Sequence, residues 1–251
     1  MRDTVRFLFF TLAAPQFLLF ADDGADLRHA AGRGETEIVR KLLAKKKKPW
    51  LDKADEDGDT ALMRAVNYDR IDVVEMLIHA GANPNKRNRR TGQTPFLVAA
   101  MEGRADVMRI LLMRKAKVNQ TDTNGRTALM WAIRWGHKEV VQMLLDLKAD
   151  PDIIDKDGNI ALVYAMVYGP NLELAELLIK AGANVNLSTN DRGTPIMVAA
   201  NFGQLEMVKL LIAAKANVNV RDRRGNLVLK TASGVKRDEI LAILRAAGAR
   251  D

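Results

Sequence analysis

A short phrase that ends in Gly-x-Thr recurs along the chain, and each copy comes just before a helical pattern. The last position of the phrase falls at Thr60, Thr94, Thr127, Ile160, Thr194 and Leu227. Successive positions are 34, 33, 33, 34 and 33 residues apart. A fixed period of this length indicates stacked copies of one supersecondary unit, because a single globular core imposes no such spacing. The chain is therefore predicted to form a linear array in which each unit packs against its neighbours.

The unit around Thr127 shows the pattern most clearly. Thr127 can accept backbone N–H groups at the start of a helix, and Gly136 suits the left-handed conformation that ends one. After His137, the apolar residues within 140–145 follow the spacing of a second helix. A loop that contains Pro151 then leads to the next turn. Each unit is thus expected to consist of a short helix, a tight turn, a longer helix and a loop.

These phrases resemble the ankyrin repeat, whose consensus runs from Asp-x-x-Gly-x-Thr-Pro-Leu-His through Gly-His to Gly-Ala-x-Val-Asn. The matching phrases are Thr94-Pro95, Thr194-Pro195, Thr60-Ala61-Leu62, Gly136-His137, Gly81-Ala82-Asn83-Pro84-Asn85 and Gly182-Ala183-Asn184-Val185-Asn186. They cover roughly residues 24–251. The resemblance implies an all-α ankyrin-repeat solenoid of about seven helix–turn–helix units with short β-turn or hairpin fingers.

Several departures from the consensus affect packing and stability. The family's His after Thr-Pro-Leu is replaced, so apolar packing is expected at Met63, Leu97, Met130, Val163 and Met197, with Lys230 as the polar exception. Ile160 and Leu227 stand where a helix-opening Thr belongs, at a cost of about 1 kcal/mol each. Arg192 also takes a glycine slot, and an extra residue enters near Pro170. The array is therefore expected to be weakest from residue 157 to 193.

The phase of the phrases gives the expected boundaries of the units. The N-terminal cap unit is placed at 24–54, the internal units at 55–88, 89–121, 122–154, 155–188 and 189–221, and the C-terminal cap unit at 222–251. Together they form one ankyrin-repeat domain over residues 22–251. Both terminal units are rich in charged residues, as expected for caps that face water on one side.

Residues 1–21 have the order of a secretory signal peptide. Arg2 and Arg6 precede an apolar stretch over 7–20, and the small residue Ala21 offers a cleavage point. The stretch is shorter than the roughly 20 residues of a transmembrane helix, although an anchoring helix is the alternative interpretation. We expect export to the periplasm, with full secretion as the alternative, and a monomeric mature chain without a transmembrane span. The absence of cysteine excludes disulfides and a cysteine-linked lipid anchor.

The two residues before each turn between helices lie on the concave groove in the family. The resemblance therefore implies a partner-binding groove that contains Asn67, Tyr68, Met101, Glu102, Arg134, Trp135, Tyr168, Asn201 and Phe202. Aromatic side chains beside Arg are typical of protein-binding hot spots. The alternative is that these aromatic residues only pack against adjacent turns. Trp131 and Tyr164, four residues earlier than two of them, are expected to pack within or between units.

Basic residues crowd one finger, at Lys86, Arg87, Arg89 and Arg90. The formal net charge is +8, and loss of residues 1–21 would leave +7, because two arginines and one aspartate leave with them. Arg forms forked bonds with carboxylates and phosphates, so this finger could meet an anionic partner, or it could be solvated charge. The second functional hypothesis is thus a binder of an anionic surface such as phospholipid, lipopolysaccharide or nucleic acid. Export makes nucleic acid the least expected of the three.

Catalytic and metal-binding patterns are missing from the sequence. His29, His79 and His137 fall at different phases of the repeat, and the chain has no Cys, no Gly-x-Ser-x-Gly phrase and no phosphate-binding Gly-rich loop. The acidic turns at 55–59 and 155–159 lack the first acidic residue and the final Glu of a calcium loop. We therefore predict a non-enzymatic protein without cofactor or metal, which recognises another protein or a peptide through a preformed groove.

Overall fold

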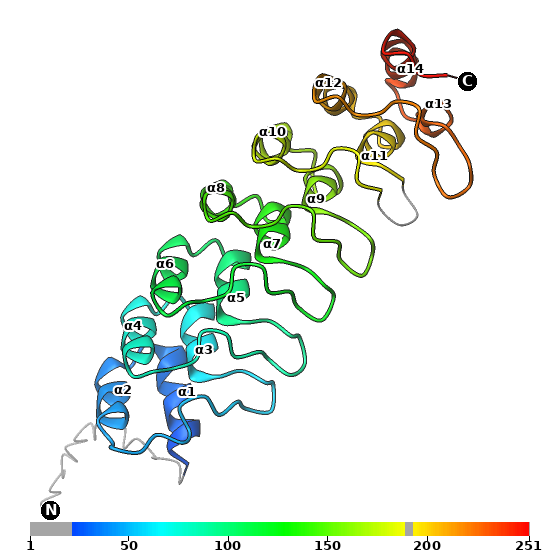
Figure 1. Ribbon diagram of the computed structural model, residues 1–251. Helices are drawn as coiled ribbons and strands as arrows, with labels where there is room; N and C mark the ends of the chain where they lie inside the picture. Colours follow the sequence, from blue (N-terminus) through cyan, green and yellow to red (C-terminus); the bar gives the residue numbers. More distant parts are fainter. Residues whose placement is uncertain (1–21, 189–192, 251) are drawn as a thin grey trace, which may run out of the picture.

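The computed structural model describes residues 22–188 and 193–250, so the expected signal peptide at 1–21 lies outside the described residues. Within them, fourteen helices follow one another as seven pairs (Figure 1). The first helices of the pairs are α1 (Asp23–Arg33), α3 (Ala61–Asn67), α5 (Pro95–Met101), α7 (Ala128–Arg134), α9 (Ala161–Val167), α11 (Pro195–Asn201) and α13 (Val228–Thr231). The second helices are α2 (Thr36–Leu43), α4 (Ile71–His79), α6 (Ala105–Met113), α8 (Lys138–Asp146), α10 (Leu172–Lys180), α12 (Leu205–Ala213) and α14 (Arg237–Ala246).

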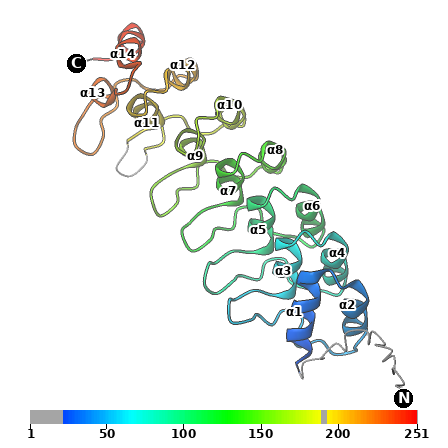
Figure 2. The same cartoon turned by 180° about the vertical axis from the view of Figure 1, so that it is seen from behind.

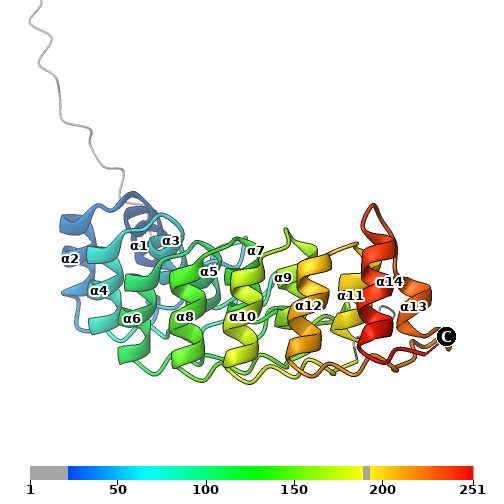
Figure 3. The ribbon, with the colours of Figure 1, turned by 90° about the horizontal axis from the view of Figure 1, so that it is seen from above.

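The pairs stack into an elongated array of two helical rows. Helix α5, for example, contacts its partner α6 and the first helices α3 and α7 of the neighbouring pairs. The even-numbered helices lie side by side in one row (Figure 3), and α1 and α14 lie at opposite ends of the array (Figure 2). Long loops project beside the odd-numbered helices (Figure 1). We call these loops the fingers, and the side formed by the fingers and the odd-numbered helices the groove face.

The all-α solenoid predicted from the sequence is therefore confirmed. Single antiparallel bridges join Thr121 with Thr127 and Arg221 with Leu227. Both bridges close a finger just before an odd-numbered helix. The fingers are thus tight turns and not a sheet.

The helix starts explain why the recurring Thr matters, and they add one departure. The hydroxyls of Thr60, Thr94 and Thr127 accept the backbone N–H three residues later, at 3.2, 3.3 and 3.2 Å. Ile160 and Leu227 provide no such bond. Thr194 also makes none, and its buried hydroxyl has no partner in the described part of the chain. Among the first helices of the pairs, the three without a side-chain cap are thus the last three, α9, α11 and α13.

The turn between paired helices requires a left-handed residue. At Gly103, with φ +70°, an added Cβ would lie 2.6 Å from Nδ1 of His137, so both the conformation and the space require glycine. The His137 ring is held there by a 3.0 Å contact between Nε2 and the carbonyl of Met101. Asp69 adopts the same conformation with φ +54°, and its carboxylate lies 3.2 Å from Arg104 of the next unit. Because the turn has the same conformation in each internal unit, the residue before it lies at the same place on the groove face.

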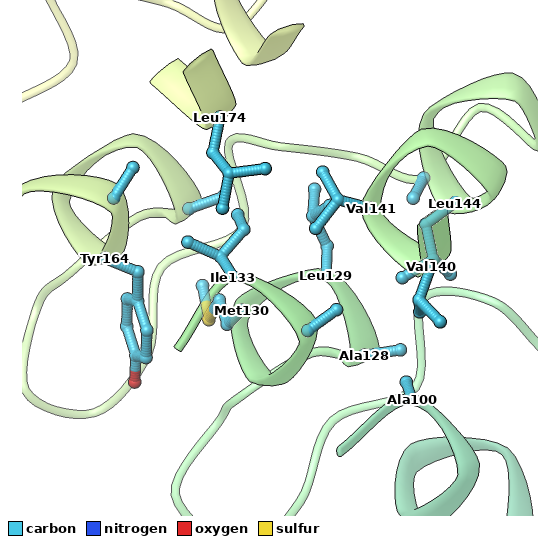
Figure 4. Close-up of a cluster of buried hydrophobic side chains, with 14 of the residues drawn as sticks. Ala100, Ala128, Leu129, Met130, Ile133, Val140, Val141, Leu144, Tyr164 and Leu174 are labelled. Carbon is cyan, nitrogen blue, oxygen red and sulfur yellow. The ribbon is translucent and has the colours of Figure 1, made fainter. Parts of the chain in front are cut away.

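The core runs continuously through the array. Figure 4 shows Leu129 of α7 beside Val141 of α8, and Ile133 of α7 beside Leu174, which reaches in from α10 of the next unit. The apolar residues that replace the family's His are all buried, with at most 1% exposure, at Met63, Leu97, Met130, Val163 and Met197. Apolar packing at this position, which the sequence predicts, is thus confirmed. Each unit depends on its neighbours to bury this surface.

Candidate partner-binding face

Four large aromatic side chains are exposed at one position of the repeat. Tyr68 is 56% exposed, Trp135 58%, Tyr168 40% and Phe202 47%. Each is the C-cap that directly follows the last residue of its helix, in α3, α7, α9 and α11. In the third unit the same position holds Glu102, which is also exposed. We call the four aromatic residues the aromatic row. Their exposure places them outside the core, while a role in binding stays a prediction.

Below this row, three fingers are each fixed to their own helix by a carboxylate. Asp122 accepts a bond from Nε1 of Trp131 at 3.1 Å, and Asp155 accepts one from the hydroxyl of Tyr164 at 2.7 Å. Burial and the bond to Asp155 raise the pKa of Tyr164, so this phenol stays protonated. The second oxygen of Asp155 accepts the N–H of Asn159 at 2.8 Å and so orders the finger itself. Trp131 and Tyr164 therefore position the fingers.

The finger at 55–59 uses the same link with a different donor. Arg64 Nη2 lies 2.6 Å from Oδ2 of Asp55. Burial raises the pKa of Asp55, but the backbone N–H of Asp59 and the Arg64 guanidinium outweigh it and hold this pKa below its ordinary value. Arg64, Trp131 and Tyr164 are the fourth residues after the helix-opening positions 60, 127 and 160. Sequence reasoning missed this shared role, although the constant spacing of nine residues from each finger Asp was a visible signal.

The centre of the groove face is a stack of rings and guanidinium groups. The Arg134 guanidinium carbon lies 4.2 Å from the ring centre of Tyr168 and 5.6 Å from that of Trp131. Arg126, in the finger, lies 5.4 Å from the Trp131 ring and pairs with Asp157 of the next finger at 3.1 Å. The contacts join two neighbouring units across the groove face. Such contacts are worth about 0.5–2 kcal/mol each, so the stack is a preformed surface.

The other predicted groove residues have different environments. Asn67 and Met101 are half-buried, and Gln93 Nε2 lies 3.7 Å from the sulfur of Met101. Asn201 is exposed and, together with Phe202, lines an open cavity of about 390 Å³ beside the last finger. This cavity lies where α13 has only 4 residues, compared with 7 in α11. The predicted residues therefore share a face without forming one continuous pocket.

The basic finger is partly neutralised by its neighbour. Arg90 pairs with Asp57 at 3.0 Å, whereas Arg87 and Arg89 are exposed and Lys86 is half-buried. Asn88, in the middle of the finger, is buried and donates to the carbonyl of Asp57 at 3.0 Å and to Asp59 Oδ1 at 2.8 Å. The amide of Asn88 thus joins two fingers where a carboxylate would repel Asp59. Only part of the predicted basic cluster is free to meet an anion.

Residues 22–188 and 193–250 contain no group of three or more His, Asp or Glu side chains arranged to hold a metal ion. None of the helices described is both long enough and apolar enough to cross a membrane.

A family model of three ankyrin repeats matches residues 3–88, 81–157 and 162–250. The chain therefore belongs to the ankyrin repeat family. Among similar solved structures, the ankyrin repeat domain of Bcl-3 is 28% identical with a TM-score of 0.79, covering 88% of this chain and 97% of that one. An ankyrin repeat domain from Acinetobacter baumannii AYE is 34% identical with a TM-score of 0.70, covering 76% of this chain and 98% of that one.

Curated relatives match over shorter parts of their own length. Human ankyrin repeat and SOCS box protein 3 is 34% identical over 187 residues, which are 74% of this chain and 36% of that protein. Glycerophosphocholine phosphodiesterase gde1 of Schizosaccharomyces pombe is 34% identical over 88 residues, which are 35% of this chain and 8% of that enzyme. The chain thus spans only a small part of these relatives. The ankyrin fold that they share with it is generally a non-enzymatic binding scaffold.

Proposed function

We propose that this protein binds another protein or a peptide through its groove face and has no catalytic activity of its own. One observation carries the proposal: four exposed aromatic side chains occupy the same position in four units, and the fingers of three of these units are fixed by hydrogen bonds. Tyr and Trp are enriched in interface hot spots because they supply large contact areas at low entropic cost. The rigid frame also lowers the ordering cost of association.

Location in the cell envelope belongs to the proposal and rests on the order of basic, apolar and small residues at 1–21. An exported scaffold of this type would meet envelope or extracellular proteins. Binding to an anionic surface is the second candidate, favoured by the exposed Arg87 and Arg89. The aromatic row is the stronger support, because the pairing of Arg90 with Asp57 removes part of the finger's charge.

The test is selection of 12-residue peptides from a displayed library against the purified chain that starts at residue 22. Selected peptides are synthesised, and their dissociation constants are measured for the wild type, Trp135→Ala and Met113→Ala. Met113 is a matched control because it is 65% exposed at the end of α6, in the other row of helices. We expect Trp135→Ala to weaken binding and Met113→Ala to leave it unchanged. Equal effects of both substitutions would contradict the proposal.

Salt separates the two candidates. Binding that depends on phosphate contacts falls steeply with added salt, whereas binding by aromatic anchors changes little. The comparison uses vesicles with an anionic lipid and the selected peptides, each measured at low and at physiological salt. Strong, salt-sensitive vesicle binding that is lost on changing Arg87 and Arg89 to Glu would favour the anionic surface instead.

A further inference from the structure

Arg134 differs from the other arginines that touch its stack or hold a finger. Arg64 and Arg126 each pair with a finger carboxylate. Arg134 touches only rings, those of Trp131 and Tyr168. In the part of the chain that the structure describes, no carboxylate or carbonyl oxygen accepts a bond from its guanidinium. A half-buried cation without an anion is costly in a folded protein, and the cost disappears when an anion binds.

Three carboxylates that bond to residues in or beside the stack already have partners. Asp122 accepts bonds from Trp131 Nε1 at 3.1 Å and from the N–H groups of Asn124 and Arg126 at 2.8 and 2.9 Å. Asp155 holds the Tyr164 hydroxyl, and Asp157 pairs with Arg126. Each of these acids has a structural partner that fixes a finger. Arg134 therefore cannot gain one of them without releasing a finger.

The stacking also fixes how Arg134 would meet a ligand. A guanidinium that lies over aromatic rings uses its faces for the rings and keeps its N–H groups in the plane, where they form a fork that matches a carboxylate. Tyr168 lies in the next unit, so the fork is held from two sides. Trp135, the next residue along the chain, is 58% exposed. The free donors thus lie beside an open aromatic surface.

We propose that Arg134 is a carboxylate-binding site at the centre of the groove face, and that the partner is an extended peptide segment with an Asp or Glu side chain. An apolar side chain of the same segment packs on Trp135. A projecting acidic side chain fits better than a flat anionic membrane, because Arg134 is half-buried against the rings of Trp131 and Tyr168, and Tyr168 and the adjacent residue Trp135 are exposed. This inference rests on the proposed function, since it names the chemistry that the same face recognises.

The experiment uses the displayed 12-residue library against the purified chain that starts at residue 22, followed by synthesis of the best binder and of its Glu→Gln or Asp→Asn version. Both peptides are measured against the wild type, Arg134→Gln, Arg134→Lys and the control Arg114→Gln. Arg114 is an exposed arginine at the end of α6, in the other row. We expect the selected peptides to be rich in acidic residues. Arg134→Gln should lower affinity for the acidic peptide about 10- to 100-fold, Arg134→Lys less, and Arg114→Gln not at all.

The amide peptide distinguishes ionic recognition from a structural role. If Arg134 binds the carboxylate, the Arg134→Gln variant and the wild type bind the amide peptide within about twofold of one another. If Arg134→Gln weakens both peptides equally, the residue only holds the rings in place and the inference is wrong. If the Arg134→Gln variant does not fold, the affinities of the Arg134→Lys variant, which keeps the positive charge, are compared for the same two peptides. If binding of the selected peptides requires Trp135 but not Arg134, this inference is wrong and the proposed function stands. If binding requires neither residue, or if no peptide is selected, both are wrong.

Discussion

The Trp135→Ala substitution tests whether the aromatic row serves recognition or architecture. Trp135 ends α7 in the middle of the array, next to the Arg134 stack. Its side chain makes no hydrogen bond within the described residues, so truncation removes surface and leaves no buried polar group unpaired. The substitution therefore separates two contributions, the area that Trp135 covers in the folded chain and the area that it offers to a partner.

The magnitude follows from the exposure of the side chain. A Trp side chain can bury up to about 250 Å². With 58% exposed, about 145 Å² is open to a partner and about 105 Å² is already covered. At about 25 cal/mol per Å², these areas set upper bounds of about 3.6 kcal/mol for binding and about 2.6 kcal/mol for folding. A partner covers only part of the open area, so we expect a loss of about 2 kcal/mol in binding, or roughly 30-fold in Kd. The stability loss should be about 1–2 kcal/mol, below the roughly 3–5 kcal/mol of a buried aromatic truncation.

Both quantities are measured on the same protein. Isothermal titration with a selected peptide gives Kd, and urea unfolding followed by far-ultraviolet circular dichroism gives the free energy of unfolding. Met113→Ala serves as the control for loss of exposed apolar area in the other row. A stability loss of more than about 3 kcal/mol with unchanged Kd would refute the reasoning. Trp135 would then pack against its neighbours, as in the alternative that the sequence leaves open.

Three further predictions follow from the fingers and the N-terminus. Tyr164→Phe should lower the unfolding free energy by about 1–3 kcal/mol in urea titration, because Asp155 loses a buried donor, while Tyr168→Phe should have little effect. Burial, aided by repulsion from Asp55, raises the pKa of Asp59 above 3.8 despite the bond from Asn88. The wild type therefore loses stability as pH rises through that folded pKa, and Asp59→Asn should be more stable at pH 7 with a difference that vanishes well below pH 3.8. Finally, mass spectrometry of the exported protein should find an N-terminus after Ala21, and intact Met1 would contradict export.

The fold could be predicted from the sequence because each repeat contains the same helix-start and turn residues at the same spacing. Thr60, Thr94 and Thr127 each identify a helix start, and their spacing fixes the phase of every other residue in the unit. From that phase, the C-cap position of the aromatic row could be placed with no further information. The failed cap at Thr194 could not be read from the sequence, because the residue type is right and only its hydrogen bond is missing.

The parts of the site that depend on contacts between units were not predictable in this way. The aromatic row could be recognised because its residues share one position of the repeat. The position of Arg134 over Tyr168, in contrast, depends on how two helices from different units approach each other. The pairing of Arg90 with Asp57 likewise crosses from one finger to another. In both cases an arginine that the sequence alone would suggest is an isolated positive charge contacts an aromatic ring or a carboxylate about one repeat away. Repeat phase fixes which residues face the groove, and side-chain geometry between units decides which of their charges remain available.

The distribution of helix caps indicates where along the groove face a partner binds best. The units that present Tyr68 and Trp135 start with a Thr hydroxyl bonded to the backbone, whereas those of Tyr168 and Phe202 start without such a bond. Since each missing cap costs about 1 kcal/mol and units stabilise only their neighbours, the second half of the array opens more readily. A partner that spans the whole row must order this half at its own cost. Trp135 is the last row residue in a capped unit and lies beside Arg134, so the strongest anchor is expected there, with affinity falling off toward Phe202.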